Sequence, residues 1–117
     1  MSSLSDLLEA LADRPGVDAV VLVSPDGLTV GHAGAGGTDP DALAALAATA
    51  VRHAERLADG AERGALRTLL LEAEVGSLLL SLAHDGHWLL LRLADDAEFG
   101  DLLYDLRRQR PALSALL

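Results

Sequence analysis

A few residues of this chain carry side chains that could take part in hydrolysis. Ser24, Asp26 and His32 supply the three residue types of a serine hydrolase triad. Such enzymes commonly hold the serine in a Gly-x-Ser-x-Gly elbow, and Ser24 lies instead in the sequence LVSPD. The paired carboxylates of Asp95 and Asp96 precede a predicted helix and are interpreted as charges at its N-terminus. Because no nucleophile, base and orienting group can be assembled, we expect no enzymatic activity.

Two histidines flank a tight turn and could bind a metal ion. His84 and His87 stand on either side of Asp85-Gly86, so Asp85 could complete a small ligand cluster. A zinc site normally uses three or four protein ligands, and this chain has no cysteine and no further ligand nearby in sequence. We therefore interpret the histidines as exposed hairpin residues and expect no bound metal or cofactor.

A glycine-rich stretch at residues 31–37, GHAGAGG, is the third candidate for chemistry because such loops can bind phosphates. A phosphate-binding P-loop needs a Gly-Lys-Ser/Thr sequence at the start of a helix, and this chain contains no lysine. The glycine spacing also differs from the dinucleotide-binding pattern. We interpret the stretch as a connector between a strand and a helix.

Composition narrows the class of partner. The chain has 117 residues, of which 50% are hydrophobic, and a formal net charge of −9. An acidic chain is repelled by the phosphates of nucleic acids and by anionic membrane surfaces. We find no signal peptide and no apolar run that could span a bilayer, so we expect a cytoplasmic protein. The use of arginine without lysine is typical of a GC-rich bacterial genome.

Helix and turn signals divide the first half of the chain into four elements. Leucines at helical spacing predict a helix over residues 3–13, with Ser3 as its N-cap and Asp6 in the capping-box position. Residues 17–24 and 28–33 predict two strands joined by a Pro-Asp-Gly turn. Asp39 and Pro40 then predict the start of a helix that continues to about residue 58.

The two sides of this central helix differ in composition. We expect the following residues to pack against a sheet: Leu43, Leu46, Ala47, Ala50, Ala54 and Leu57. We expect the opposite side to carry small residues followed by basic ones: Ala45, Ala48, Thr49, Arg52 and Arg56. Arg52 and Arg56 can form ordinary surface ion pairs with nearby acidic residues, or they can bind an acidic partner.

The second half of the chain predicts three strands and a helix. Strands are expected over residues 66–73, 77–84 and 87–93, and each contains three consecutive leucines, which is typical of strands buried on both faces. Helices must therefore cover both sides of the sheet. A last helix is expected over residues 98–110, ended by Pro111, and the apolar tail 112–117 has no assigned place. The predicted fold class is α+β, with the order α-β-β-α-β-β-β-α in a single domain over residues 1–117.

The chain resembles the roadblock/LC7 family over nearly its whole length. The resemblance rests on the opening helix, the sequence PGVDAVVLVSPDGLTV at 15–30, the alanine-rich central helix, the three-strand meander and ADDAEFGDLLYDLR at 94–107. It implies a profilin-like, five-stranded antiparallel sheet with the central helix on one face and the terminal helices on the other. It also implies a homodimer formed by pairing of the third strands, with the central helices side by side.

Many members of that family bind Ras-like small GTPases as regulators or scaffolds, and one is a bacterial gliding-motility and polarity protein that acts on such a GTPase. The resemblance therefore predicts a non-enzymatic, homodimeric module that regulates a bacterial Ras-like GTPase in signalling. The alternatives are a scaffold without effect on GTP turnover and a small-ligand sensor. We expect the dimer interface to include Arg67, Leu69, Leu71, Ala45 and Ala48. We expect the GTPase to contact Thr49, Arg52 and Arg56.

Overall fold

The computed structural model of the protein describes residues 3–34 and 37–117. Its elements follow the predicted order, with these bounds: α1 Leu4–Ala12, β1 Val17–Val23, β2 Thr29–Gly34, α2 Pro40–Gly60, β3 Thr68–Ala73, β4 Gly76–His84, β5 His87–Leu93 and α3 Phe99–Leu116. The predicted fold class is therefore confirmed. Part of the glycine-rich stretch, residues 35–36, lies outside the described residues.

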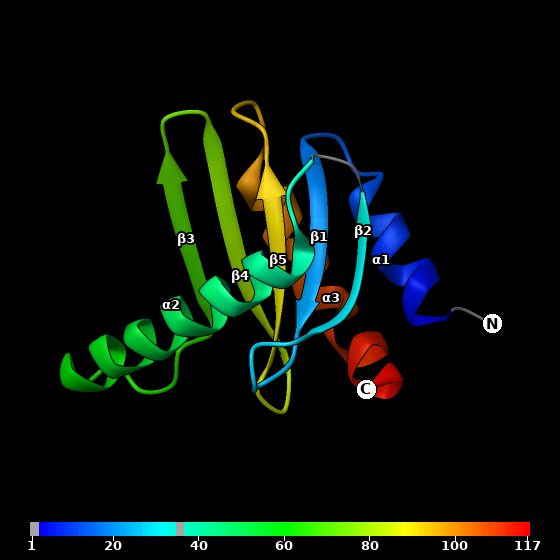
Figure 1. Cartoon of the computed structure of the whole chain (residues 1–117). Coiled ribbons are helices and arrows are strands. Elements are labelled where there is room, and N and C mark those ends of the chain that lie inside the picture. The colour runs from blue at the N-terminus through cyan, green and yellow to red at the C-terminus, as the bar shows by residue number, and fades with distance from the viewer. Residues whose placement is uncertain (1–2, 35–36) are drawn as a thin grey trace.

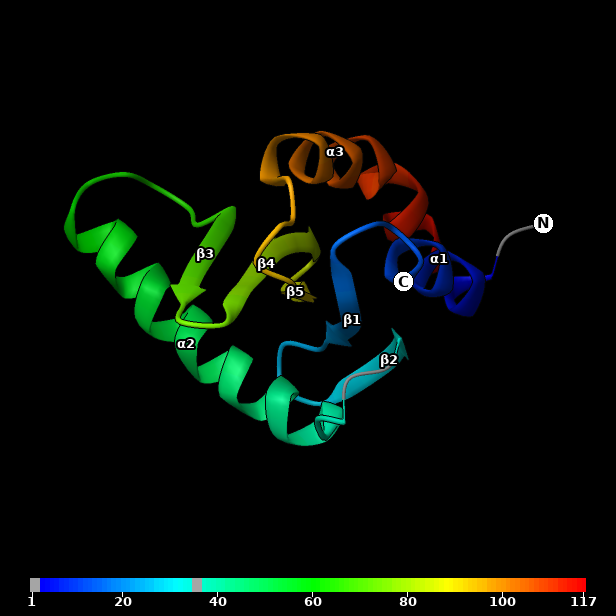
Figure 2. The ribbon, with the colours of Figure 1, turned by 90° about the horizontal axis from the view of Figure 1, so that it is seen from above.

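The five strands form one antiparallel sheet in the order β2-β1-β5-β4-β3. Helix α2 crosses one face of this sheet, and α1 and α3 lie on the other face (Figures 1 and 2). Strand β2 precedes α2 in the chain and β3 follows it, and these two strands form the two edges of the sheet. Each edge strand has a sheet neighbour on one side only.

The predicted helix starts and the predicted tight turn are confirmed. The Ser3 Oγ accepts a hydrogen bond from the Asp6 backbone N–H at 3.1 Å, and the Asp6 Oδ2 accepts one from the Ser3 backbone N–H at 3.2 Å. The Asp39 Oδ1 accepts one from the Asp41 backbone N–H at 3.1 Å, ahead of Pro40 at the first helical position. Between β4 and β5, Asp85 and Gly86 have φ values of 46° and 80°, as a two-residue hairpin turn requires.

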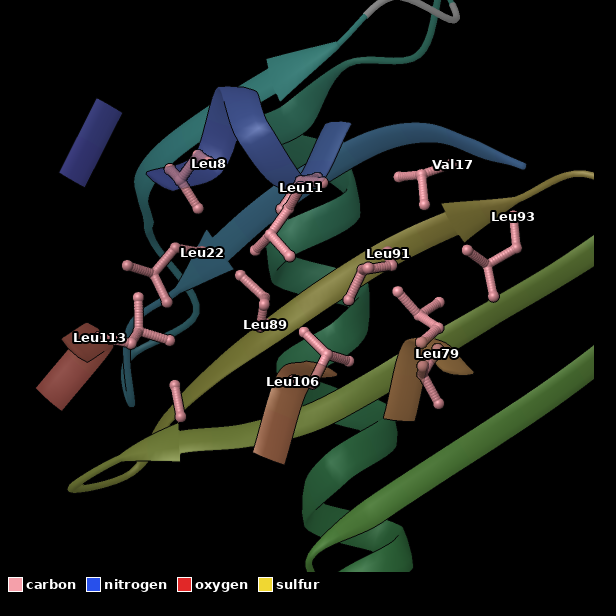
Figure 3. Packing of buried hydrophobic residues seen from close by; sticks show 13 residues of the cluster. Leu8, Leu11, Val17, Leu22, Leu79, Leu89, Leu91, Leu93, Leu106 and Leu113 are labelled. Atoms are coloured by element: carbon pink, nitrogen blue, oxygen red, sulfur yellow. The ribbon is translucent and has the colours of Figure 1, made fainter. Parts of the chain in front are cut away.

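Apolar side chains fill both faces of the sheet. The cluster on the α1 and α3 side, called here the terminal-helix cluster, joins leucines of both helices to those of the strands; Figure 3 shows Leu8, Leu11, Leu22, Leu89, Leu91, Leu106 and Leu113 among them. The cluster under α2, called here the central-helix cluster, consists of Val21, Val23, Ala44, Ala47, Val51, Leu80, Trp88 and Leu90. The expectation of helices on both faces is thus confirmed.

The predicted core face of α2 is partly wrong. The buried residues of this helix are Ala44, Ala47 and Val51, whereas Leu46 and Leu57 are 68% and 74% exposed. Of the residues expected to face the sheet, Ala47 is buried, and Leu43, Ala50 and Ala54 are half-buried. Alanine occupies both sides of the helix, so more than one apolar stripe can be drawn through its sequence. The stripe of small residues is the one that lets α2 approach the sheet closely.

The predicted end of the last helix is also wrong. Helix α3 continues through Pro111 to Leu116, so the apolar tail is its final part. A proline inside a helix removes one backbone hydrogen bond and crowds the preceding turn. Leu113 is buried in the terminal-helix cluster beyond it, and the burial of this side chain offsets part of that cost.

Strand β3 differs from β4 and β5 in its burial. All three contain consecutive leucines, but only β4 and β5 are covered on both faces, and in β3 Leu70 and Leu71 are 41% and 45% exposed. Leu70 pairs with Leu79 of the terminal-helix cluster, and Leu71 pairs with Leu78 on the opposite face. The expectation of burial on both faces is therefore wrong for this edge strand, because neither helix layer covers it fully.

The burial of α2 generates a paired mutational prediction. Val51→Asp should unfold the domain, because a carboxylate without a partner would lie in the central-helix cluster, at a cost of about 3 kcal/mol or more. Leu46→Asp should keep the fold, since the side chain is exposed and the loss of helix propensity costs about 0.5 kcal/mol. Far-ultraviolet circular dichroism with urea titration distinguishes the two variants. Unfolding of Leu46→Asp together with an intact Val51→Asp would contradict the assigned orientation of α2.

Candidate functional site

The candidate site is the outer side of α2 together with β3. Helix α2 has 21 residues and crosses the sheet obliquely, so that its C-terminal part extends beyond β3 (Figures 1 and 2). Its two exposed leucines, Leu46 and Leu57, lie eleven positions apart, which is three turns of a helix and places them on one side. The sequence analysis missed this stripe because it assigned both leucines to the core.

Two alanines predicted to lie in the dimer interface have different surroundings. Ala45 is exposed and Ala48 is half-buried. Gly27, in the β1–β2 turn, has a φ of 82°, and a Cβ built at this position would lie 3.1 Å from the Ala48 Cβ. The small size of Ala48 is therefore explained by the turn that packs against it within the same chain. This contact contradicts the expectation that Ala48 lies on the free outer surface.

The three residues predicted to bind a partner are exposed on α2. The Thr49 hydroxyl donates to the Ala45 carbonyl at 3.2 Å, and Arg52 Nη2 donates to the Thr49 Oγ1 at the same distance. These two bonds hold the Arg52 guanidinium against its own helix. Among the described residues, neither Arg52 nor Arg56 forms the surface ion pair that was the ordinary alternative. Both positive charges are thus available on a chain of net charge −9.

A groove of about 220 Å³ runs beside Arg52, between α2 and the two hairpin turns of β1–β2 and β4–β5. Trp88, which is 6% exposed, contributes to its apolar floor with Val23 and Val51. Pockets for small-molecule ligands typically measure roughly 300–1,000 Å³. A groove of this size fits one side chain of a protein partner better than a separate small ligand. The sequence showed no signal for it, because its lining comes from three distant segments.

The predicted interface residues of β3 lie along its exposed edge. Leu69 is half-buried against the central-helix cluster, and Leu71 on the same face is more exposed. Arg67 is exposed and immediately precedes the strand, and its carbonyl accepts a hydrogen bond from the Leu82 backbone N–H at 2.9 Å. The strand therefore presents both apolar side chains and an unpaired backbone edge.

The residues considered for catalysis are not brought together as a triad. The Ser24 Oγ accepts a hydrogen bond from the Leu28 backbone N–H in the β1–β2 turn, whereas His32 lies within β2 opposite Val21. His84 and His87 flank their turn as predicted, with the His87 Nδ1 3.1 Å from the His84 carbonyl oxygen. Asp95 and Asp96 lie in the loop before α3. Within residues 3–34 and 37–117 no group of three potential metal ligands is found.

None of the described helices combines the length and the apolar character that crossing a bilayer requires.

The comparisons with known proteins identify the same architecture. The family model described as Roadblock/LC7 domain matches residues 4–92. Among solved structures, a Roadblock/LC7 domain from Streptomyces avermitilis has 27% sequence identity and a TM-score of 0.83, covering 96% of this chain and 98% of that one. No curated protein matches the chain.

Two further solved structures are similar in fold at lower sequence identity. MglB of Myxococcus xanthus is 18% identical, with a TM-score of 0.87 and coverage of 96% of this chain and 92% of that one. The gliding protein MglB of Thermus thermophilus is 21% identical, with a TM-score of 0.82 and coverage of 95% and 85%. All three similarities extend over the whole sheet and both helix layers.

The hairpin histidines generate a prediction about metal binding. The double variant His84→Ala, His87→Ala should melt within a few degrees of the wild type, because neither ring is buried. Elemental analysis of the purified wild type should find no stoichiometric zinc. One tightly bound metal per chain, lost in the double variant, would contradict the interpretation of these residues as hairpin surface.

Proposed function

This chain belongs to the Roadblock/LC7 domain family, and on that premise we propose that it is a non-enzymatic, cytoplasmic homodimer that binds and regulates a bacterial Ras-like small GTPase. The proposal rests on the apolar side chains of α2 and β3 that remain exposed to solvent in a single copy of the chain. Apolar side chains are exposed on adjoining elements, with Leu70 and Leu71 on β3 and Leu46 and Leu57 on α2. Large apolar side chains exposed together on adjoining elements are a feature of interaction sites.

Pairing of β3 with β3 of a second copy would satisfy the open edge. The strand has no proline, and its side chains include only one charge, that of Glu72. An open strand of this composition is an aggregation hazard unless it is covered. A two-fold axis through the paired strands would continue the sheet across both copies and place the two α2 helices on the same face. Leu46, Leu57 and Leu71 would then face the second copy.

The GTPase is proposed to contact the side of α2 that carries Thr49, Arg52 and Arg56. The Arg52 guanidinium is held by Thr49 at the rim of the groove over Trp88, so a cation and an apolar recess lie together. Arginine beside an aromatic-lined recess is a typical composition for the centre of a protein interface. Binding there would favour one arrangement of the switch regions of the GTPase and so change its GTP turnover.

The scaffold alternative shares the same surfaces and differs only in its consequence. A regulator changes the rate of phosphate release when added to its GTPase, whereas a scaffold binds and leaves that rate unchanged. The small-ligand alternative has less support, because the hollow beside Arg14 and Pro15, of about 280 Å³, and the groove beside Arg52, of about 220 Å³, are both below the usual size for such ligands.

The first prediction from this proposal concerns the dimer. Leu71→Glu should leave each copy folded, since the side chain is already 45% exposed, but it should weaken dimerisation by at least about tenfold, which corresponds to about 1.4 kcal/mol. Sedimentation velocity measures the change. Leu28→Glu, at a 66% exposed position beside the opposite edge, is the matched control and should dimerise normally. A Leu71→Glu protein that dimerises as tightly as the control would place the interface elsewhere.

The second prediction concerns the GTPase. The double variant Arg52→Glu, Arg56→Glu should remain a dimer and should bind the GTPase encoded nearest to it at least about tenfold more weakly, with a slower association rate. Arg63→Glu, an exposed change beyond the end of α2, serves as the control. Calorimetric titration gives the affinities. Equal affinities for all three proteins would exclude this side of α2 from the interface.

A further inference from the structure

The C-terminal half of α3 carries the densest group of positive charges in the chain. Arg107, Arg108 and Arg110 lie within four positions, and residues 106–117 contain no acidic residue. Among the described residues, none of these arginines forms an ion pair with a carboxylate. On a chain with 18 acidic and 9 basic residues, a basic group without an acidic partner is unexpected. Neither the proposed dimer nor the proposed GTPase site uses it.

An exposed aromatic residue lies beside these arginines. Tyr104 is 63% exposed, and the Arg108 guanidinium carbon lies 5.8 Å from the centre of its ring, which is a cation–π distance. Tyr104, Arg107 and Arg108 are three to four positions apart and therefore share one side of the helix, called here the α3 basic face. Tyrosine and arginine are among the residue types most enriched at the energetic centres of protein interfaces.

Helix α1 presents the opposite charge on its solvent side. Asp6 and Glu9 lie on the helix and Asp13 forms its C-cap, and all three are exposed at spacings of three and four positions. The helix contains no basic residue. We call this surface the α1 acidic face. The Asp6 carboxylate accepts a hydrogen bond from the Ser3 backbone N–H, and this bond does not neutralise its negative charge.

The two charged faces are neighbours on the outer surface of one helix layer. Leu7 and Leu11 of α1 line the same small hollow as Leu106 and Leu113 of α3, so the helices pack side by side. An ion pair between Arg14 and Asp105 joins them at the C-terminal end of α1. Figure 2 shows the C-terminal end of α3 beside α1, on the face of the sheet that α2 does not cover.

We propose that this helix layer binds a second copy of the chain, with the α3 basic face of each copy on the α1 acidic face of the other. A two-fold rotation exchanges two adjacent helices, so a layer in which the acidic α1 lies beside the basic C-terminal half of α3 is complementary to itself. Tyr104 would be covered at the centre of the contact. Because the contact depends on exposed charges, it is weak at high salt and stronger at low salt.

The distribution of charge favours a second copy of the chain over a nucleic acid or an anionic membrane as the partner. A nucleic acid or an anionic membrane is negative along its whole length, so beyond the three arginines it would meet the acidic remainder of a chain whose net charge is −9. A second copy instead offers three exposed acidic side chains to the arginines, and its own arginines meet the acidic side chains of the first copy. The contact lies on the opposite side of the sheet from α2 and away from the open edge of β3, so it can join β3-paired dimers into larger assemblies.

Charge reversal tests this contact. In sedimentation velocity at low salt, the wild type should show an average mass that rises with concentration above that of the β3-paired dimer and falls when salt is added. Arg107→Glu with Arg108→Glu should raise the dissociation constant of this step at least about tenfold, and so should Glu9→Arg with Asp13→Arg. Combining the four substitutions leaves two glutamates on the α3 side and two arginines beside Asp6 on the α1 side, so opposite charges face each other again and most of the lost association should be recovered. Arg56→Glu, on α2, is the control and should associate like the wild type.

The outcomes separate this proposal from the preceding one. In the Leu71→Glu background the helix-layer contact should still form, now between monomers, so loss of the β3 dimer leaves it measurable. The proposal is overturned if the wild type does not associate beyond the β3 dimer, if the arginine reversals leave association unchanged, or if the variant with all four substitutions is not restored. It is equally overturned if the arginine reversals abolish GTPase binding and leave self-association as it was, because the face then belongs to the GTPase.

Discussion

The rest of the structure depends on one constraint, which is that the central strands direct apolar side chains to both faces of the sheet. In β5, Trp88 and Leu90 point to one face and Leu89 and Leu91 to the other. Successive side chains of a strand alternate between faces, so one helix layer cannot remove all of them from water. Burial of each leucine contributes roughly 1.5–3 kcal/mol, which makes an uncovered face far too costly. A second helix layer is therefore obligatory, and α1 and α3 supply it.

The same constraint determines which surfaces remain for partners. Three helices cover the three central strands, and the sheet edge at β3 and the outward side of α2 stay exposed with their leucines. The charges are divided in a related way, because most of them lie on the outer surfaces of the helices and in the turns. Arg52 and Arg56 therefore lie outside one layer, while Tyr104, Arg107 and Arg108 lie outside the other. Two faces with different chemistry result from a single core.

Local signals predicted the elements well and the helix orientations less well. The capping residues Ser3 and Asp39 and the Asp85-Gly86 turn act within a few positions along the chain, so their sequence is sufficient to recognise them. The buried side of α2 is a different problem. Alanine is a compatible residue both in a close helix–sheet contact and on a surface, so the choice between Val51 and Leu46 could not be made from periodicity. Similarly, Pro111 locally favours the end of a helix, but α3 continues past it and the burial of Leu113 stabilises the longer helix.

The residues alone determined the fold class, the order of the elements and the need for two helix layers. The family resemblance added the prediction that β3 is the strand that pairs with a second copy. The first three follow because backbone preferences and the alternation of apolar residues act locally and are written along the chain. Only the folded arrangement decided that β3 is an open edge, that Ala48 packs on Gly27, and that Trp88 floors a groove beside Arg52. It also placed the acidic α1 beside the basic end of α3. Each of these contacts joins segments far apart in sequence, and such contacts are selected by the packing of the whole domain.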